Sequence, residues 1–195
     1  MLIQTPKKTY TLEEYRQLEE TADFRNEYHD GEIIPMTDGS INHNRIIGNI
    51  FAYLKFALRG KNAEVFMTDL RLWIPRYRRG TYPDVMVISG EPVFNDGRND
   101  EILNPSLIVE VLSKSTQEYD KGNKFRFYRS IPEFSEYLLV SQYEFYVEQY
   151  IKNGAEQWLF LAYEGENAVV RFNLAGVEMS LKDIYEKLNF DWEEI

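Results

Sequence analysis

An acidic residue lies inside an apolar strand pattern at residues 105–115, PSLIVEVLSKS. Its neighbours are typical of a strand that is buried on both faces: Leu107, Ile108, Val109, Val111 and Leu112. Glu110 stands among them, and a carboxylate in such a strand is costly unless it finds a cation, a hydrogen-bond donor or a proton. The chain must therefore build a covered sheet and supply a partner for Glu110 inside it.

The N-terminal part of the chain predicts a helix, a hairpin and a longer helix. TLEE at 11–14 has the spacing of a capping box, which opens the first helix. An Asp-Gly pair at 30–31 lies between two strand-like arms and indicates a hairpin. Apolar residues then recur at helical spacing between 46 and 58, and Gly60 follows as a stop, so this is the longest predicted helix.

Strand patterns dominate the rest of the chain. The predicted strands cover residues 64–74, 82–89, 106–113, 135–141, 144–152 and 156–164, the last two as an antiparallel pair. The polar segment 90–105 predicts a surface loop, and helices are predicted over 117–129 and after the SLKD cap at 180–183. The fold class that follows is α/β: a mixed central sheet flanked by helices, with an antiparallel C-terminal strand extension, in a single domain over 1–195.

The composition limits the classes of function that the chain can serve. Its 195 residues carry a formal net charge of −10, which argues against a broadly basic nucleic-acid surface but leaves room for a locally basic cleft. Cysteine is absent, which excludes a thiol nucleophile, disulfides and a thiolate zinc site. No P-loop pattern occurs, and no apolar run suits a signal peptide or a membrane span, so we expect a cytoplasmic protein without membrane contact.

Two further charged residues are candidate neighbours of Glu110. Asp84 follows Pro83 at the opening of the preceding strand, and pairing of the two strands would bring two carboxylates together. Converging carboxylates repel unless a cation bridges them, and their oxygens suit Mg²⁺ or Mn²⁺. Lys124, on the predicted helix that follows, could point its ammonium at the same strand end. The spacing alone leaves another interpretation open, in which an arginine neutralises Glu110 and Asp84 caps a turn.

Four motifs occur in order along the chain: YPDV at 82–85, IVEVLSKST at 108–116, YDKGNKFRFY at 119–128 and EYLLV at 136–140. NEYHDGEIIPM and INHNRIIGNI precede them. Together these segments resemble the Uma-type restriction endonuclease family, a bacterial group within the PD-(D/E)XK nuclease superfamily. The resemblance covers roughly residues 10–187. It implies a restriction-endonuclease-like fold and a metal-dependent endonuclease that hydrolyses phosphodiester bonds in DNA.

The resemblance also implies which residues bind the metal. Asp84 and Glu110 correspond to the family's metal ligands, with the backbone carbonyl of Val111 as a further ligand, and the metal is Mg²⁺ or Mn²⁺. Glu27 corresponds to an additional N-terminal acid found near this metal. A metal held in this way polarises a phosphate oxygen and lowers the pKa of a bound water, which then attacks the phosphodiester.

The catalytic lysine departs from the superfamily pattern. Its usual position falls at Leu112, so the resemblance implies that the following helix supplies the ammonium, from Lys124. Lys114 is a rival, but it falls beyond the expected end of the strand. Small nucleases of this kind often pair to cut two strands, so a homodimer is also expected.

Other polar residues admit two interpretations each. His43 could approach the cleft or serve only as a helix-capping or surface residue, and His29 is predicted to be exposed beside the Asp-Gly turn. Asp120 is predicted to be a helix N-cap with no catalytic role. The densest basic cluster consists of Arg71, Arg76, Arg78 and Arg79. These arginines could contact DNA phosphates or only offset neighbouring acids at a solvated edge.

Two other functions are compatible with the same residues. A non-catalytic nucleic-acid or protein-binding module that keeps the nuclease fold is favoured by the net charge of −10 and by Leu112 at the usual lysine position. A metal-dependent hydrolase that acts on RNA or on another phosphodiester would use the same ligands.

Overall fold

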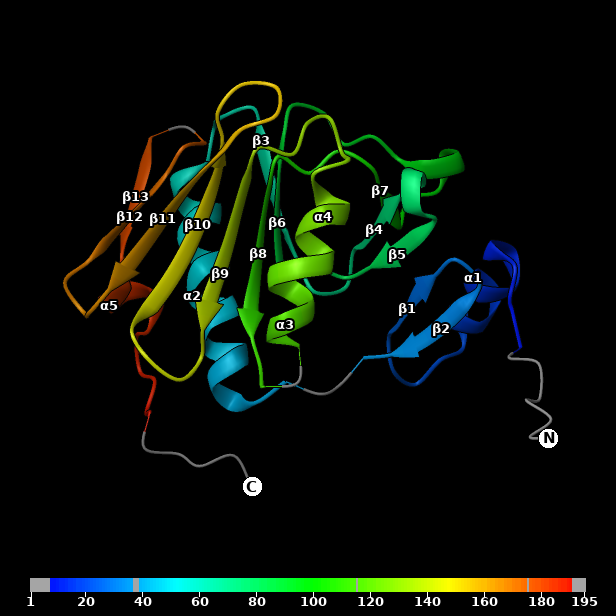
Figure 1. Ribbon diagram of the computed structural model, residues 1–195, viewed down its shortest axis with the longest axis horizontal. Helices are drawn as coiled ribbons and strands as arrows, with labels where there is room; N and C mark the ends of the chain where they lie inside the picture. Colours follow the sequence, from blue (N-terminus) through cyan, green and yellow to red (C-terminus); the bar gives the residue numbers. More distant parts are fainter. Residues whose placement is uncertain (1–7, 37–38, 115, 175, 191–195) are drawn as a thin grey trace.

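The computed structural model describes residues 8–36, 39–114, 116–174 and 176–190, and its centre is a six-stranded mixed sheet (Figure 1). In spatial order the strands are β11 (Trp158–Glu164), β10 (Tyr146–Lys152), β9 (Glu136–Ser141), β8 (Leu107–Leu112), β6 (Val85–Ser89) and β3 (Ala63–Met67). β8 and β9 run parallel, whereas every other neighbouring pair is antiparallel. The predicted mixed sheet and its antiparallel extension by β10 and β11 are confirmed.

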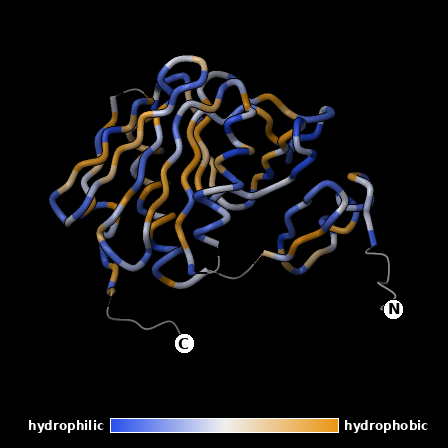
Figure 2. The backbone as a smooth tube through the Cα atoms, viewed as in Figure 1, coloured by the Kyte–Doolittle hydropathy of each residue, from blue (hydrophilic) through white to orange (hydrophobic). Residues whose placement is uncertain are grey.

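Helices cover both faces of this sheet, which explains why its strands are apolar on both sides (Figure 1). The helices are α2 (Ile41–Ala57) on one face and, on the other, a continuous segment of α3 (Gln117–Tyr119), a π-helical turn (Asp120–Lys124) and α4 (Phe125–Tyr128). Val109 of β8 packs in the same apolar cluster as Ile46 and Ile50 of α2. Ile108 and Leu112 pack on the opposite side with α4. Figure 2 shows apolar residues concentrated along the central strands.

A smaller sheet beside the first one carries the N-terminal hairpin. Its strands are, in order, β2 (Glu32–Pro35), β1 (Asn26–His29), β5 (Arg79–Thr81), β4 (Arg71–Ile74) and β7 (Glu101–Ile102). The hairpin turns at Asp30 and Gly31, whose φ angles of +46° and +101° belong to the predicted Asp-Gly turn. α1 (Leu12–Glu20) packs against β1, and the side chains of Thr11 and Glu14 form the predicted capping box.

Two predicted boundaries are wrong at the junction of the two sheets. The pattern at 64–74 is two strands, β3 and β4, because the chain turns at Thr68 (φ +44°) and passes from one sheet to the other. The segment 90–105 is not entirely a surface loop, since it contains the fully buried strand β7, which pairs in parallel with β4. Both errors have one cause: the partner strands lie far away in the sequence, so no local pattern announces them.

The C-terminal part adds a hairpin that the sequence patterns do not predict. Its strands, β12 (Val169–Phe172) and β13 (Val177–Ser180), place Val170, Phe172 and Met179 in the apolar cluster that contains α2. The short helix α5 (Leu181–Ile184) follows with Ser180 as its N-cap, as predicted. Two 3-10 turns, Pro75–Tyr77 and Asn95–Gly97, complete the described elements. Among the described residues, no helix has the length and apolar character needed to cross a membrane.

Candidate active site

Adjacent strands of the central sheet bring Asp84 beside Glu110. Val85 of β6 pairs with Val109 of β8 in antiparallel register, so the residue before β6 lies next to the C-terminal half of β8. The backbone N–H of Val111 donates a 2.7 Å hydrogen bond to Asp84 Oδ2. The strand pairing therefore brings the two acids together, as predicted. Asp84 binds the backbone of β8 and does not cap a turn.

Lys124 and Tyr128, not an arginine, compensate Glu110. Glu110 Oε1 lies 3.2 Å from Lys124 Nζ and accepts a 2.6 Å hydrogen bond from the Tyr128 hydroxyl, and all three side chains are buried. Burial raises the pKa of Glu110, the ammonium of Lys124 opposes that shift, and the charges of Asp120 and Asp84 add to it, so that the pKa is raised overall. Burial alone would lower the pKa of Lys124, but the surrounding carboxylates raise it well above its usual value.

A π-helical turn aligns three side chains on the face of the helix that meets Glu110. Residues four apart advance by about 40° on an α-helix, so Asp120, Lys124 and Tyr128 would spread over about 80°. The π-helical turn Asp120–Lys124 has wider turns and opposes this drift. Asp120 Oδ1 lies 3.1 Å from Lys124 Nζ, and the Tyr137 hydroxyl donates to the Asp120 carbonyl at 3.2 Å. π-Helical turns are frequent at functional sites.

Asp120 is therefore not the helix N-cap that the sequence predicts. The helical segment begins at Gln117, three residues earlier, and Asp120 is buried inside it with its carboxylate toward Lys124. The sequence does carry a signal, because 120, 124 and 128 share a four-residue spacing, but only the π-helical turn makes that spacing a common face. Lys121, which an α-helical projection places with Lys124, instead forms an ion pair with Glu148 at 2.7 Å.

Glu27 reaches the same ammonium from the smaller sheet. Its Oε1 lies 3.7 Å from Lys124 Nζ and accepts a hydrogen bond from the Thr81 hydroxyl, and its Oε2 lies 2.7 Å from His29 Nε2. Although burial raises the pKa of Glu27, the charge of Lys124 and the hydrogen bonds from His29 and Thr81 lower it to about 2. The ammonium is thus shared by carboxylates from both sheets and from its own helix.

The prediction that His29 is exposed is wrong. Its side chain is only 16% exposed, because the ring packs 5.8 Å from the ring of Tyr119 and Nε2 binds Glu27. The Tyr119 hydroxyl lies 3.3 Å from His29 Nε2 and also accepts a 3.3 Å hydrogen bond from Arg79 Nη1. Both residues lie within motifs of the family resemblance, NEYHDGEIIPM and YDKGNKFRFY, but nothing in those motifs predicts that the two side chains meet.

His43 contacts the site from α2, on the other side of Asp84. Its Nε2 lies 3.3 Å from Asp84 Oδ2, and its backbone N–H is capped by the Ser40 hydroxyl. Burial lowers the pKa of His43, but the hydrogen bond and charge of Asp84 outweigh burial and raise it. The Ser40 side chain also binds Gln142, whose amide donates to the Leu112 carbonyl at 2.9 Å. The helix start is thereby attached to the end of β8.

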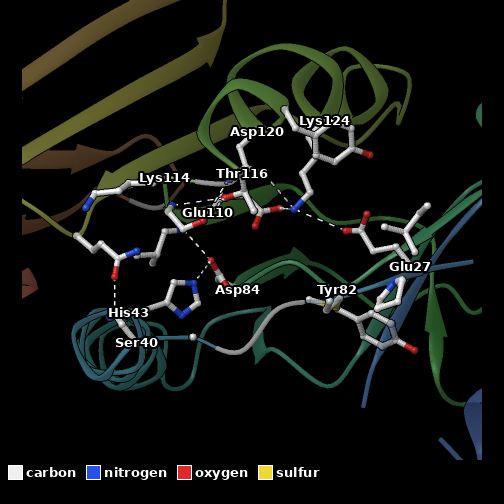
Figure 3. A pocket seen from close by; sticks show the side chains of 18 of the residues that line it. Glu27, Ser40, His43, Tyr82, Asp84, Glu110, Lys114, Thr116, Asp120 and Lys124 are labelled. Carbon is white, nitrogen blue, oxygen red and sulfur yellow. Dashed lines mark hydrogen bonds and ion pairs between the residues drawn. The ribbon is translucent and has the colours of Figure 1, made fainter. Parts of the chain in front are cut away.

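These side chains surround one pocket of about 870 Å³ between the central sheet and the N-terminal hairpin (Figure 3). Asp84, Glu110, Asp120 and Lys124 lie toward its floor, and Ile34 of β2 lines the hairpin side. Lys114 lines the pocket as well, but it is exposed, and its Nζ lies 5.5 Å from the centre of the Tyr143 ring. Of the two candidate lysines, Lys124 is the one that contacts Glu110.

The predicted basic cluster does not act as one group. Arg71 is buried and pairs with Asp100 and Glu101, so it belongs to the interior. Arg78 is exposed and pairs with Asp30 at the hairpin turn at 2.7 Å. Arg76 lies within the 3-10 turn before β5, and Arg79, the first residue of β5, reaches the pocket through Tyr119.

The oxygen set at the pocket floor suits a hard divalent cation. Glu110 is buried against the charges of Asp84 and Asp120, and the single ammonium of Lys124 contacts Glu110 and Asp120 but not Asp84, so an added cation would relieve the repulsion among the three carboxylates. Within the described part of the chain, no group of three or more acidic or imidazole side chains is arranged to hold a metal. Mg²⁺ commonly uses one or two carboxylates and takes its other ligands from water and substrate phosphates, so Asp84, Glu110 and the Val111 carbonyl fit it.

The fold is shared with a solved structure. A crystal structure described as "a putative nuclease belonging to DUF820" from Anabaena variabilis matches with a TM-score of 0.73, covering 92% of this chain and 99% of that chain at 20% sequence identity. The chain therefore has the mixed α/β fold of that protein.

Sequence comparison identifies the family. The model of the Uma2 family, described as "Putative restriction endonuclease", matches residues 12–182, and the chain belongs to this family. The uncharacterized protein sll1609 of Synechocystis is 44% identical over 89% of this chain and 98% of its own length. A second uncharacterized Synechocystis protein, slr1290, is 36% identical over 91% of this chain and 92% of its own length.

Proposed function

We propose that this protein is a divalent-metal-dependent endonuclease that hydrolyses phosphodiester bonds in DNA. The observation that carries the proposal is the buried carboxylate of Glu110, paired with Lys124 and placed beside Asp84 at the floor of an open pocket. A buried acid that only stabilised the fold would not need two further acids beside it. Membership in the restriction endonuclease family supports the same reaction class.

In this proposal Asp84, Glu110 and the carbonyl of Val111 hold Mg²⁺ or Mn²⁺. The bound metal would polarise a phosphate oxygen and lower the pKa of a water. Lys124, fixed by three carboxylates, would stabilise the negative charge that develops on the phosphate. Glu27 and Asp120 hold this ammonium in place, and His43 fixes the carboxylate of Asp84, one of the two proposed acidic metal ligands.

The proposal extends to partners that the pocket alone does not specify. A homodimer would supply two sites for the two strands of a duplex, and the expected site of action is the cytoplasm. RNA remains the alternative substrate, because the same ligands would serve an RNA phosphodiester. A binding module without catalysis would keep the fold but not need the shared ammonium.

The direct test is cleavage of supercoiled plasmid, single-stranded DNA and RNA with Mg²⁺, Mn²⁺ or EDTA. We expect DNA cleavage with either metal, none with EDTA, and a loss of roughly 10²-fold or more in Asp84→Asn and Lys124→Met. Cleavage of RNA alone would replace the proposed substrate. Metal and DNA binding without cleavage would support the binding module instead.

Glu136→Gln is the matched control. Glu136 is a buried carboxylate in the neighbouring strand β9, and burial raises its pKa as it does for Glu110. It accepts from the backbone N–H groups of Asn173 and Leu174, at 3.1 and 3.2 Å, and does not line the pocket. Full cleavage by this variant, with the loss confined to the pocket variants, separates catalysis from general damage. Equal cleavage by all the variants would contradict the proposed site.

A further inference from the structure

Three arginines lie over two aromatic rings next to the pocket, the half-buried ring of Tyr77 and the buried ring of Phe127. The rings of Tyr77, in the 3-10 turn before β5, and Phe127, in α4, lie 4.7 Å apart. Arg79 Cζ lies 4.2 Å from the centre of the Phe127 ring, and Arg126 Cζ lies 5.2 Å from it. Arg126 and Arg76 also lie over Tyr77, at 5.7 and 5.8 Å. We call Arg76, Arg79 and Arg126 on these two rings the arginine track.

The arginine track carries uncompensated positive charge in an acidic protein. The chain has a net charge of −10, so acids are plentiful, and Arg78, close by in the sequence, pairs with Asp30 at 2.7 Å. Within the described residues, none of the three track arginines forms an ion pair with a carboxylate. Arg76 and Arg126 are exposed and Arg79 is half-buried. Three like charges are thus held together by ring faces rather than by counter-charges.

Stacking on a ring leaves the donor edges of a guanidinium free. A guanidinium that lies over an aromatic face is held through that face, while its N–H groups still point outward in the geometry that matches phosphate oxygens. Stacking also reduces the side-chain freedom that a flexible surface arginine would lose on binding. The arginine track therefore suits an anion with repeated phosphate groups, because three guanidinium groups lie close together and only one donor, Arg79 Nη1, is used within the track, on the Tyr119 hydroxyl.

The track is continuous with the pocket. Arg79 Nη1 donates to the Tyr119 hydroxyl, and Tyr119 contacts His29, which binds Glu27 beside Lys124. α4 and the β4–β5 connection lie side by side (Figure 1). A nucleic-acid strand whose scissile phosphate lies at Lys124 would therefore present its neighbouring phosphates along Arg79 and then Arg76 and Arg126.

We infer that the arginine track binds the phosphate backbone of the DNA substrate and sets its direction across the pocket. The inference rests on the proposed function for the identity of the ligand. It adds Arg126 to the DNA contacts that the sequence suggests, with Tyr77 and the buried Phe127 as the rings over which the arginines lie, and it leaves out Arg78, which is already engaged by Asp30. Contacts of this kind position the strand without reading its sequence.

The test is equilibrium binding of a fluorescein-labelled DNA duplex in EDTA, where no metal-dependent cleavage occurs, as a function of NaCl. The plot of log K for association against log [NaCl] has a negative slope. For Arg76→Gln/Arg126→Gln the magnitude of this slope should decrease by about 1.8, at about 0.9 for each lost phosphate contact, and binding at low salt should weaken roughly tenfold or more. Arg79→Gln should decrease the magnitude of the slope by about 0.9.

The control is Arg171→Gln/Lys182→Gln, which removes the same charge. Both residues are exposed, at 78% and 73%, they pair with Glu178 and Glu166, and they lie at the β12–β13 end, away from α4 (Figure 1). This variant should bind DNA with the slope of the parent protein. An equal decrease of the slope's magnitude in the control would mean that net charge alone determines binding. An unchanged slope in the track variants would overturn the inference that the track binds DNA. Equally tight, equally salt-dependent binding of polyglutamate would overturn its assignment to nucleic acid.

The same measurements separate this inference from the proposed function. Absence of cleavage, with a track-dependent slope, would overturn the endonuclease and leave the track standing. Metal-dependent cleavage by protein whose track variants bind DNA as the parent does would overturn the track and leave the endonuclease standing.

Discussion

Two clusters of ionic side chains among the described residues, each built around a buried glutamate, differ in their balance of charge. Beneath α1, three arginines meet three acids: Arg16, Arg71 and Arg98 with Asp96, Asp100 and Glu101. At the pocket floor, one ammonium meets three acids, Lys124 with Glu27, Glu110 and Asp120, and the carboxylate of Asp84 lies near Glu110 without contacting Lys124. We call these the arginine–acid cluster and the lysine cluster.

Glu101 and Glu110, one buried glutamate from each cluster, respond to these surroundings in opposite directions, whereas Glu27 of the lysine cluster has its pKa lowered by Lys124, His29 and Thr81. In the arginine–acid cluster, burial opposes ionisation of Glu101, but the hydrogen bonds from Arg16 and Asn95 and the charges of Arg71 and Arg16 together outweigh burial and lower its pKa. The hydrogen bond from Arg98 likewise lowers the pKa of Asp100. In the lysine cluster the pKa of Glu110 is raised. A balanced cluster is complete by itself and holds elements together, whereas a cluster with surplus negative charge, open to a pocket, leaves a place for a cation.

The largest expected effect is that of Glu110→Gln on DNA cleavage. The amide keeps the shape of the side chain but removes a metal ligand and the ammonium's closest charge partner on β8, so cleavage should fall by about 10³-fold. Stability in EDTA should stay the same or rise, because the ionised form of Glu110 is unfavourable in the fold. Plasmid cleavage and thermal unfolding measure the two quantities. A large fall in stability with normal cleavage would mean that the lysine cluster is structural.

Glu101→Gln should do the reverse. Glu101 is fully buried and binds Arg16 at 2.8 Å through both oxygens, so its loss leaves buried arginine charge unpaired and should lower the free energy of unfolding by about 3 kcal/mol. Cleavage by the folded protein should be unchanged. Denaturant unfolding at neutral pH measures the stability, and cleavage below the unfolding transition measures activity.

The pH dependence checks the cause of that loss. Because the pKa of Glu101 is lowered in the folded state, its contribution is present above the ordinary glutamate pKa of about 4.3 and is lost as the pH falls through the folded value. The difference between the parent protein and Glu101→Gln should therefore be full at neutral pH and shrink in acid. A difference that stays constant down to acid pH would point to packing instead of charge.

The sequence predicts the strand that holds Glu110 but not what surrounds it. Apolar runs identify the central strands because those strands are covered on both faces, and the alternation of β8 correctly places Ile108 and Leu112 on one side and Val109 on the other. Glu136 shows the limit of that reasoning. It is a single acid in an apolar strand, like Glu110, yet its partners are two backbone N–H groups after β12 and the side-chain amide of Gln149. Only the tertiary neighbours distinguish the two.

The missed parts of the site depend on geometry that no local pattern encodes. Asp120 joins Lys124 because one turn of the helix is π-helical, and the i, i+4 spacing is otherwise typical of a surface ion pair. His29 and Tyr119 come from segments 90 residues apart and meet only when the hairpin folds against the helix. Family resemblance identifies Asp84, Glu110 and Lys124 as candidates because the motifs that contain them occur in the family's order. It carries no information on contacts such as that of His29 with Tyr119.

Asp120→Asn should have an intermediate effect on cleavage. It removes one of three charges that hold Lys124 but neither the ammonium nor a proposed metal ligand, so we expect a 10- to 100-fold loss, roughly that of other supporting residues. The affinity for Mn²⁺ should stay the same, which separates positioning of the ammonium from metal binding. Mn²⁺ titration and cleavage rates at saturating metal are the measurements. A fall in Mn²⁺ affinity equal to that of Asp84→Asn would make Asp120 a ligand instead.

The smallest expected effect is the stabilisation of the folded protein by the metal alone. A metal that binds only the folded state at ten times its Kd contributes about 1.4 kcal/mol, which corresponds to a rise in Tm of about 3–6 °C for a chain of this size. The parent protein and Glu101→Gln should both show this rise with Mn²⁺, because the arginine–acid cluster has no surplus charge to offer. Glu110→Gln and Asp84→Asn should not. A rise that survives in Glu110→Gln would place the cation elsewhere, since the surplus of carboxylates over the single ammonium is what makes the pocket floor a cation site.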